Sequence, residues 1–399
     1  MTLFLLFSFF PLLLFSLSQI PANDCTLFCF PRKSNFIITM EIPTYQEALD
    51  ASTIYRDLIV TPVTAGLINQ TYKVIIRTNG YKYLLQQINT DVFPEPEKVQ
   101  ANYENIWSYI HYDGPPHAIK NPVTVPKPLS FLNGAKLFCD SHNKYWRISE
   151  FIDGAQTFYI ATTSIQARIV AGVFGSITSG FEYFDLDKLY ITIPGFHDLS
   201  HRFRQFKQSF HKNNYERLQN AASIINQLKE KEHYVSFYEI MTESEEFEKR
   251  LMHHDAKISN ILFSEETGKV FCPVDLDTCM PGYFFSDLGD MIRSMACSEE
   301  ESSPNFNDIN IQKDFYEAIL DGYMEVMHEL LTDSEKRYIH FSGLLMTYMQ
   351  ALRFLSDYLN GDVYYRTTYP EQNFDRAKNQ LILLQRLEAF LSENYSLRV

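Results

Sequence analysis

The first part of the chain carries short runs of β-branched and aromatic residues separated by turn residues, a pattern that predicts antiparallel strands. The runs at residues 71–77 and 81–88 flank Asn79-Gly80, a dipeptide typical of tight hairpin turns. One helix is predicted after Pro96, where apolar residues recur at helical spacing. Further strands are predicted at residues 59–64, 122–131, 136–139 and 145–152.

The pattern changes after Asp153-Gly154, and apolar residues between positions 165 and 177 follow the spacing of an amphipathic helix. One strand-like interruption is predicted later in the chain, at residues 260–276, with its turn at Thr267-Gly268. Further helices are predicted at residues 212–230, 236–252, 284–297, 310–331, 334–359 and 374–393.

These elements predict an α+β fold with two lobes. We expect residues 40–150 to form a small antiparallel-sheet N-lobe with one helix, and residues 151–399 to form a larger, mainly helical C-lobe. This is the layout of the protein-kinase-like two-lobed fold, in which a nucleotide would lie between the lobes.

Composition excludes several classes of function. The hydrophobic fraction of 45% is ample for a buried core. The net charge of −14 argues against nucleic acid and against an anionic membrane surface as partners of the catalytic part, because both require clustered Lys and Arg. The six cysteines form no CxxC pair and no Cys/His cluster, so structural zinc is not expected.

The most informative stretch is His253-His254-Asp255-Ala256-Lys257-Ile258-Ser259-Asn260, followed by Val274-Asp275-Leu276-Asp277. Phosphoryl transfer from ATP needs one carboxylate that orients or deprotonates the attacking hydroxyl. It also needs an Asn and a second Asp that hold the magnesium bridging the phosphates. An isolated Asp or Asn would more often cap a helix or form a turn, and their joint occurrence favours the catalytic interpretation.

The run HHDAKISNILF, with CPVDLDTCMPG and SDLGDMIR after it, resembles the aminoglycoside phosphotransferase and choline kinase family, and most narrowly the N-acetylhexosamine 1-kinases. The resemblance extends roughly from residue 45 to residue 393 and includes GLINQTY at 66–72 and RFLSDYL at 353–359. It implies ATP and Mg²⁺ as cofactors, a small-molecule sugar substrate, and a monomer or dimer.

The resemblance assigns roles around the motif. Asp255 is the expected catalytic base, and Asn260 and Asp275 are the expected magnesium ligands. Lys257 is expected to steady the transferring phosphoryl group and to contact substrate, although a solvated loop lysine is the simpler interpretation. Asp277, two positions beyond Asp275 and facing the same side if the segment is a strand, is expected to help the metal or touch the sugar. Asp287 is expected to pin the catalytic loop, and Asp290 to pair with Arg293.

Other candidates lie farther from the motif. Gly66 and Asn69 are expected to form the loop over the phosphates, although one glycine is a weak signal. Gln86 or Gln87 stands where protein kinases have the third-strand lysine, which leaves contact with the α- and β-phosphates open. The expected interlobe hinge, whose backbone would meet adenine, runs from Glu150 to Ile152.

Arg353 lies four residues before Asp357, so a surface pair within one helix is its simplest interpretation. The resemblance implies instead that Arg353 binds substrate, with Tyr364 as its aromatic partner. If Lys257 and Arg353 line the acceptor site, they disfavour a cationic substrate, which favours a sugar.

The sequence therefore predicts an ATP- and Mg²⁺-dependent kinase of small molecules, with the anomeric hydroxyl of an N-acetylhexosamine as acceptor. The alternatives are a kinase of choline, an aminoglycoside or a homoserine-type hydroxyl, and a pseudokinase that binds nucleotide.

Residues 3–17 are almost wholly apolar but lack a preceding Lys or Arg and a clear cleavage site. We interpret residues 1–39 as an upstream extension of a cytoplasmic enzyme, with export as the alternative.

Overall fold

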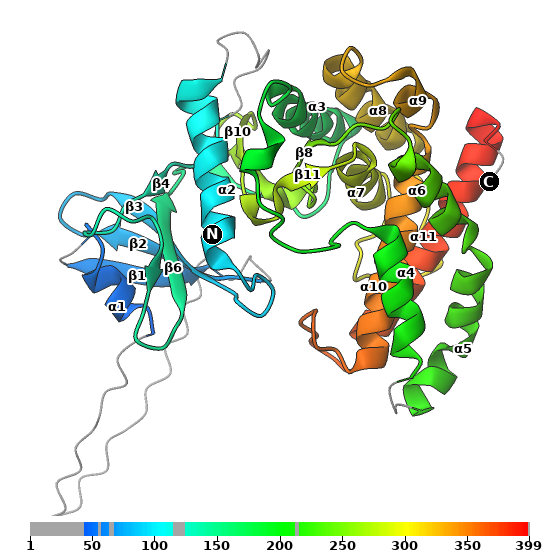
Figure 1. Cartoon of the computed structure of the whole chain (residues 1–399), viewed down its shortest axis with the longest axis horizontal. Coiled ribbons are helices and arrows are strands. Elements are labelled where there is room, and N and C mark those ends of the chain that lie inside the picture. Colours follow the sequence, from blue (N-terminus) through cyan, green and yellow to red (C-terminus); the bar gives the residue numbers. More distant parts are fainter. Residues whose placement is uncertain (1–43, 55–56, 64–67, 115–123, 212–214, 398–399) are drawn as a thin grey trace, which may run out of the picture. The chain divides into compact units, whose positions relative to one another are not determined.

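The computed structural model describes residues 44–397 apart from 55–56, 64–67, 115–123 and 212–214 (Figure 1). The residues from Thr44 onward form one compact unit. The apolar segment at residues 1–39 lies outside the described residues, and its interpretation stays a prediction. Within the described ranges, none of the helices combines the length and the apolar character that crossing a bilayer requires.

An antiparallel sheet forms the first part of the unit, as predicted (Figure 1). Its hydrogen-bonded order is β1-β2-β3-β6-β4, and β5 also pairs with β6. Within residues 122–131, however, only two residues join a strand in the described part. The strands are β1 (Leu58–Val63), β2 (Gln70–Ile76), β3 (Lys82–Ile88), β4 (Pro128–Leu129), β5 (Phe138–Cys139) and β6 (Tyr145–Glu150).

Apolar side chains on one face of the sheet form a small core. Val74, Leu85, Trp146 and Ile148 are buried together, and Leu49 from helix α1 (Gln46–Asp50) packs on them. Because side chains point to opposite faces in alternation, the neighbouring positions of β3 and β6 project to the other side of the sheet. Gln86 and Arg147 occupy two such positions and are direct partners in the β3–β6 register.

The predicted helix after Pro96 is α2 (Pro96–Ser108), which continues into a π-helical turn, η1 (Tyr109–Asp113). Tyr103, Ile106 and Trp107 from α2 pack into the same core as the helices that follow. The helix thereby connects the sheet to the rest of the unit.

Most of the remaining chain is helical, as predicted, and α10 and α11 pack along each other (Figure 1). The predicted helix at 236–252 ends at Glu243, the one at 334–359 is divided in two, and α4 was not predicted. The helices are α3 (Ser164–Gly180), α4 (Leu199–Ser209), α5 (Tyr215–Glu230), α6 (His233–Glu243), α7 (Phe285–Met295), α8 (Lys313–Met327), α9 (Asp333–Arg337), α10 (Phe341–Asn360) and α11 (Gln372–Tyr395).

The prediction of a single strand-like interruption among these helices is wrong. β9 (Ile261–Ser264) lies between β10 (Val270–Pro273) and β7 (Ala155–Gln156), and β8 (Arg250–Met252) pairs with β11 (Met280–Gly282). Strands of two or three residues are too short to show a period of two. These two ladders hold the ends of the segment from residue 253 to residue 260.

Helix α7 packs against α10 so closely that a side chain at Gly289 has no room. A Cβ atom there would collide with the backbone oxygen of Ser342 and the side chain of Met346. We expect Gly289→Ala to reduce the free energy of unfolding by about 1–3 kcal/mol despite the higher helix propensity of alanine. Urea unfolding followed by circular dichroism measures this change.

Gly172→Ala in α3 is the matched control, because its Cβ would lie 3.5 Å from the backbone oxygen of Gly322, an ordinary contact. Equal stability of the two variants would contradict the proposed close packing of α7 on α10.

Candidate functional site

The motif loop is fixed by one carboxylate at the start of α7. Asp287 is buried and accepts hydrogen bonds from the backbone N–H groups of His253 and His254, each at 2.8 Å. His254 has a positive φ of 62°, a backbone conformation unusual for a residue other than glycine. The two hydrogen bonds hold the chain in this conformation just before Asp255, in agreement with the pinning role expected for Asp287.

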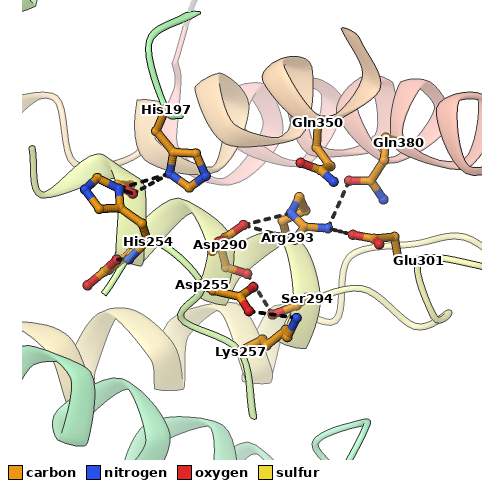
Figure 2. A network of polar contacts seen from close by, with 12 residues as sticks. His197, His254, Asp255, Lys257, Asp290, Arg293, Ser294, Glu301, Gln350 and Gln380 are labelled. Atoms are coloured by element: carbon orange, nitrogen blue, oxygen red, sulfur yellow. Dashed lines mark hydrogen bonds and ion pairs between the residues drawn. The ribbon is translucent and has the colours of Figure 1, made fainter. Parts of the chain in front are cut away.

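Asp255, Lys257 and Asn260 converge on one another. The Lys257 ammonium lies 2.9 Å from Asp255 Oδ2, and the Asn260 amide donates to the same oxygen at 2.8 Å. Figure 2 shows Asp255 and Lys257 side by side. Burial opposes ionisation of Asp255, but the Lys257 charge and these hydrogen bonds hold its pKa below the ordinary value. The carboxylate is therefore ionised at neutral pH, as a base must be.

Asp275 is the neighbour of this group at the end of the β9–β10 hairpin. The Val274 N–H donates to the Asn260 carbonyl at 2.9 Å, and the His253 ring contacts the Val274 carbonyl at 3.0 Å. Asp275 itself has a φ of 63°, so its backbone turns sharply as it leaves β10. Asn260 and Asp275, which are fifteen positions apart in the sequence, thereby lie side by side.

Electrostatics make Asp275 a suitable ligand for a cation. Surrounding protein, and the like charges of Asp277 and Asp255, raise its pKa to about 7. Asp275 is nevertheless exposed to solvent. Among the described residues Asp275 has no ion-pair partner, and the Asn260 Oδ1 atom accepts no hydrogen bond. These oxygens fit Mg²⁺, which takes one or two carboxylates beside phosphate and water.

The backbone conformation around Asp277 differs from its prediction. The segment after Asp275 is a 3₁₀ turn, η4 (Leu276–Thr278), rather than a strand, so Asp275 and Asp277 do not share a strand face. Asp277 is buried, and its two carboxylate oxygens accept hydrogen bonds from Arg147 and Asn69. These contacts pair Asp277 with the sheet, and its expected contact with the metal or the sugar stays a prediction.

The expected roles of the nucleotide-binding residues stay predictions, and the structure shows the contacts of two of them. Gly66 lies outside the described residues. Asn69 bridges to Asp277 at 2.7 Å and accepts from the backbone of Asn89 at 3.0 Å. Gln86 donates to Thr71 Oγ1 at 3.2 Å and accepts from Arg147 at 3.0 Å.

In the expected hinge, the backbone N–H of Glu150 donates to the Lys127 carbonyl, and Ile152 is half-buried. The backbone of Glu150 and Ile152 is expected to contact adenine. Their role stays a prediction.

Arg353 is not paired with Asp357, contrary to its simplest interpretation. Asp357 instead accepts the backbone N–H groups of Val363, Tyr364 and Tyr365, which shapes the turn after α10. The Arg353 guanidinium lies 4.6 Å from the centroid of the Phe196 ring and 5.9 Å and 5.6 Å from those of Tyr364 and Tyr365. It has no carboxylate partner among the described residues.

A pair of buried histidines behind the loop was not predicted from the sequence. His197 and His254 lie close to each other (Figure 2), and Ser286 Oγ lies 2.6 Å from His197 Nδ1 and 2.7 Å from His254 Nδ1. One hydroxyl has a single proton, so it donates to one ring and accepts from the other, an arrangement that suits two neutral imidazoles. Burial lowers the pKa of His254 to about 3, and burial with nearby positive charges lowers that of His197.

The predicted pair between Asp290 and Arg293 is present at 3.0 Å. Arg293 also pairs with Glu301 and contacts Gln380 of α11 at 3.5 Å (Figure 2). This network connects the face of α7 next to the loop to the C-terminal helices.

A family model described as the phosphotransferase enzyme family matches residues 59–330. The matched range runs from the first strand of the sheet to the end of α8 and includes the whole motif region.

Several solved structures share the fold. An aminoglycoside phosphotransferase from Alicyclobacillus acidocaldarius aligns with a TM-score of 0.53 and 12% identity, over 89% of this chain and 97% of its own. An ethanolamine kinase from Plasmodium vivax aligns with a TM-score of 0.54 and 14% identity, over 86% and 87%. An AMP-bound spectinomycin phosphotransferase has a TM-score of 0.50 and 14% identity, over 87% and 98%. The predicted protein-kinase-like α+β fold is thereby confirmed.

The histidine pair predicts a stability that depends on pH. An unfolded histidine takes up a proton near pH 6.5, whereas His197 and His254 stay neutral in the folded protein well below that pH. The unfolded state therefore binds more protons, and stability falls as the pH drops below about 6.5. We expect each histidine to contribute a loss of about 1.4 kcal/mol per pH unit.

Urea unfolding of His197→Gln between pH 7 and pH 5 checks this expectation, because the variant should lose stability more slowly by about one histidine's share. The control is His211→Gln, whose side chain is exposed. If His197→Gln and the unaltered protein show the same pH dependence, the assignment of a neutral buried His197 is wrong.

Proposed function

Since the chain belongs to the phosphotransferase enzyme family, we propose that it is an ATP- and Mg²⁺-dependent kinase that phosphorylates the anomeric hydroxyl of an N-acetylhexosamine. The products are a sugar 1-phosphate and ADP. The observation that carries the proposal is the convergence of an ionised base, Asp255, with Lys257, Asn260 and Asp275 at the end of one hairpin.

The chemistry assigned to each group follows from its surroundings. Asp255 orients the acceptor hydroxyl and accepts its proton as the oxygen attacks the γ-phosphorus and the bond to the β-phosphate oxygen breaks. Lys257, held at 2.9 Å from Asp255, stabilises negative charge on the transferring group. Asn260 and Asp275 would hold the magnesium, which supplies neutralisation of phosphate charge when bound.

The acceptor is argued from the surroundings of Arg353. Aromatic rings attract quaternary ammonium groups by cation–π interaction, and here Phe196, Tyr364 and Tyr365 already surround a guanidinium. Arg202 lies within 5.9 Å of the same Phe196 ring, and like Arg353 it has no carboxylate partner among the described residues. Two unneutralised cations disfavour choline, ethanolamine and aminoglycosides. A neutral polyhydroxyl acceptor accepts hydrogen bonds from a guanidinium without this repulsion.

The second candidate is a kinase of another hydroxyl acceptor, because the similar structures include an ethanolamine kinase and aminoglycoside phosphotransferases. It uses the same base and the same metal ligands, so only the acceptor separates the two candidates. A pseudokinase that only binds nucleotide is disfavoured by the presence of Asp255, Asn260 and Asp275 together.

The role of Asp255 is tested by Asp255→Asn. An amide cannot accept the hydroxyl proton, so we expect turnover to fall about 100- to 10,000-fold, while ADP binding changes less than about 3-fold. Steady-state kinetics and calorimetric titration with ADP give the two quantities. Asp321→Asn is the control, because that side chain is 67% exposed and lies on α8. Full turnover by Asp255→Asn would remove the base assignment.

The acceptor is tested by a screen with ATP and magnesium chloride in which ADP release is measured. We expect turnover with N-acetylglucosamine or N-acetylgalactosamine, loss of the reducing end in the product, and little turnover with glucosamine, choline, ethanolamine, kanamycin or homoserine. Turnover of choline or an aminoglycoside without any sugar activity would favour the second candidate and refute the sugar assignment.

A further inference from the structure

The third strand of the sheet lacks the lysine that protein kinases place at the nucleotide phosphates, and Gln86 stands in that region. A cation nevertheless lies directly beside it. Arg147 on β6 is the register partner of Gln86, and its Nε atom donates to Gln86 Oε1 at 3.0 Å. The positive charge missing from β3 is therefore present on the adjacent strand.

Arg147 is held from three sides. One terminal nitrogen pairs with Asp277, the Nε atom bonds Gln86, and the guanidinium lies 5.4 Å from the centroid of the Tyr103 ring of α2. The side chain is only 5% exposed. Its second terminal nitrogen makes no hydrogen bond among the described residues, so a buried and rigid guanidinium has donors left for a ligand.

Asp277 ties this cation to two other parts of the site. Its second oxygen accepts from Asn69, which lies just before β2 at the end of the loop expected over the phosphates. Asp277 also lies two residues after Asp275, the expected metal ligand. One carboxylate thus joins Arg147 to the β1–β2 loop and to the metal-binding turn.

Packing alone does not explain the buried Arg147–Asp277 ion pair. Burying two charges costs several kcal/mol of desolvation, roughly offset by their attraction, and apolar residues often stabilise a core equally well. Burial opposes the charged form of Arg147, but the carboxylates of Asp277 and Asp275 hold its pKa above the ordinary value. A fixed cation beside a carboxylate that is expected to bind Mg²⁺ is suited to a polyanion that carries the metal.

We propose that Arg147 contacts the phosphates of the bound nucleotide, replacing the absent third-strand lysine, and that Asp277 is the positioning residue that aims it. The proposal rests on the kinase function proposed above. In this proposal the Arg147–Asp277 pair takes the place of the lysine–glutamate pair of protein kinases. The kinase pair joins the third strand to a helix, whereas Arg147 lies on β6 and Asp277 lies in the turn η4. The planar guanidinium can bond two phosphate oxygens at once, which an ammonium group does less well.

The test is calorimetric titration of the full chain with ADP in magnesium chloride and, separately, with adenosine, which has no phosphate. We expect Arg147→Gln to weaken ADP binding about 10- to 100-fold and to change adenosine binding less than about 3-fold. The matched control is Arg77→Gln, whose exposed arginine pairs with Asp57 away from the motif region and should change neither affinity.

Two further variants guard against misfolding. Arg147→Gln leaves Asp277 buried without a counter-charge, so the double variant Arg147→Gln with Asp277→Asn removes both charges and should show the same selective loss of ADP binding. Arg147→Gln with Gln86→Lys moves the cation across the strand pair. We expect it to recover at least about 10-fold in ADP affinity, and no recovery would contradict the proposal.

The failures are distinguishable. If the unaltered chain does not bind ADP, the proposed kinase function falls and this inference with it. If the unaltered chain binds ADP and Arg147→Gln binds it equally well, or loses ADP and adenosine to the same extent, only the role of Arg147 is overturned.

Discussion

The site depends on one constraint: the carboxylates of Asp255, Asp275 and Asp277 are close enough for their charges to repel. Two of them have a compensating cation, because Lys257 pairs with Asp255 and Arg147 pairs with Asp277. Asp275 has no ion-pair partner among the described residues, and burial together with the charges of Asp277 and Asp255 raises its pKa. Three identical functional groups thus have different surroundings, which supports the different roles that we propose for them: a base, a positioning residue and a ligand for a divalent cation.

Holding these groups together requires backbone conformations that the chain would otherwise avoid. His254 and Asp275 both have positive φ, and conformations of this kind cost of order 1–3 kcal/mol each. The cost is offset by Asp287, which accepts two backbone N–H groups, and by the short β8–β11 and β9–β10 ladders on either side. Gly282 in β11 is needed there because a side chain would collide with the His254 ring.

Contacts between distant segments then connect the sheet to the helices through the site itself. Arg147 of β6 pairs with Asp277 in the turn after Asp275, and Asn69, just before β2, donates to the same carboxylate. The Phe196 ring stacks on the His197 ring, with 4.5 Å between the ring centroids, and it also lies next to the Arg353 guanidinium. The buried histidine pair and the aromatic surroundings of Arg353 are thus parts of one packed region, which connects Arg353 to the motif loop.

The sequence by itself determined the fold class, the antiparallel sheet, most helices and the convergence of Asp255, Asn260 and Asp275, because local periodicity and close spacing govern these features. It did not reveal α4, although Leu199, Phe203 and Phe206 follow helical spacing, nor strands too short to show a period. The sequence contained one indication of the importance of Arg147, because a charged residue is unusual within an apolar strand such as β6. The partner of Arg147, and the roles of His197 and Phe196, were decided only by the tertiary structure, because contacts between residues 130 positions apart leave no trace in local pattern.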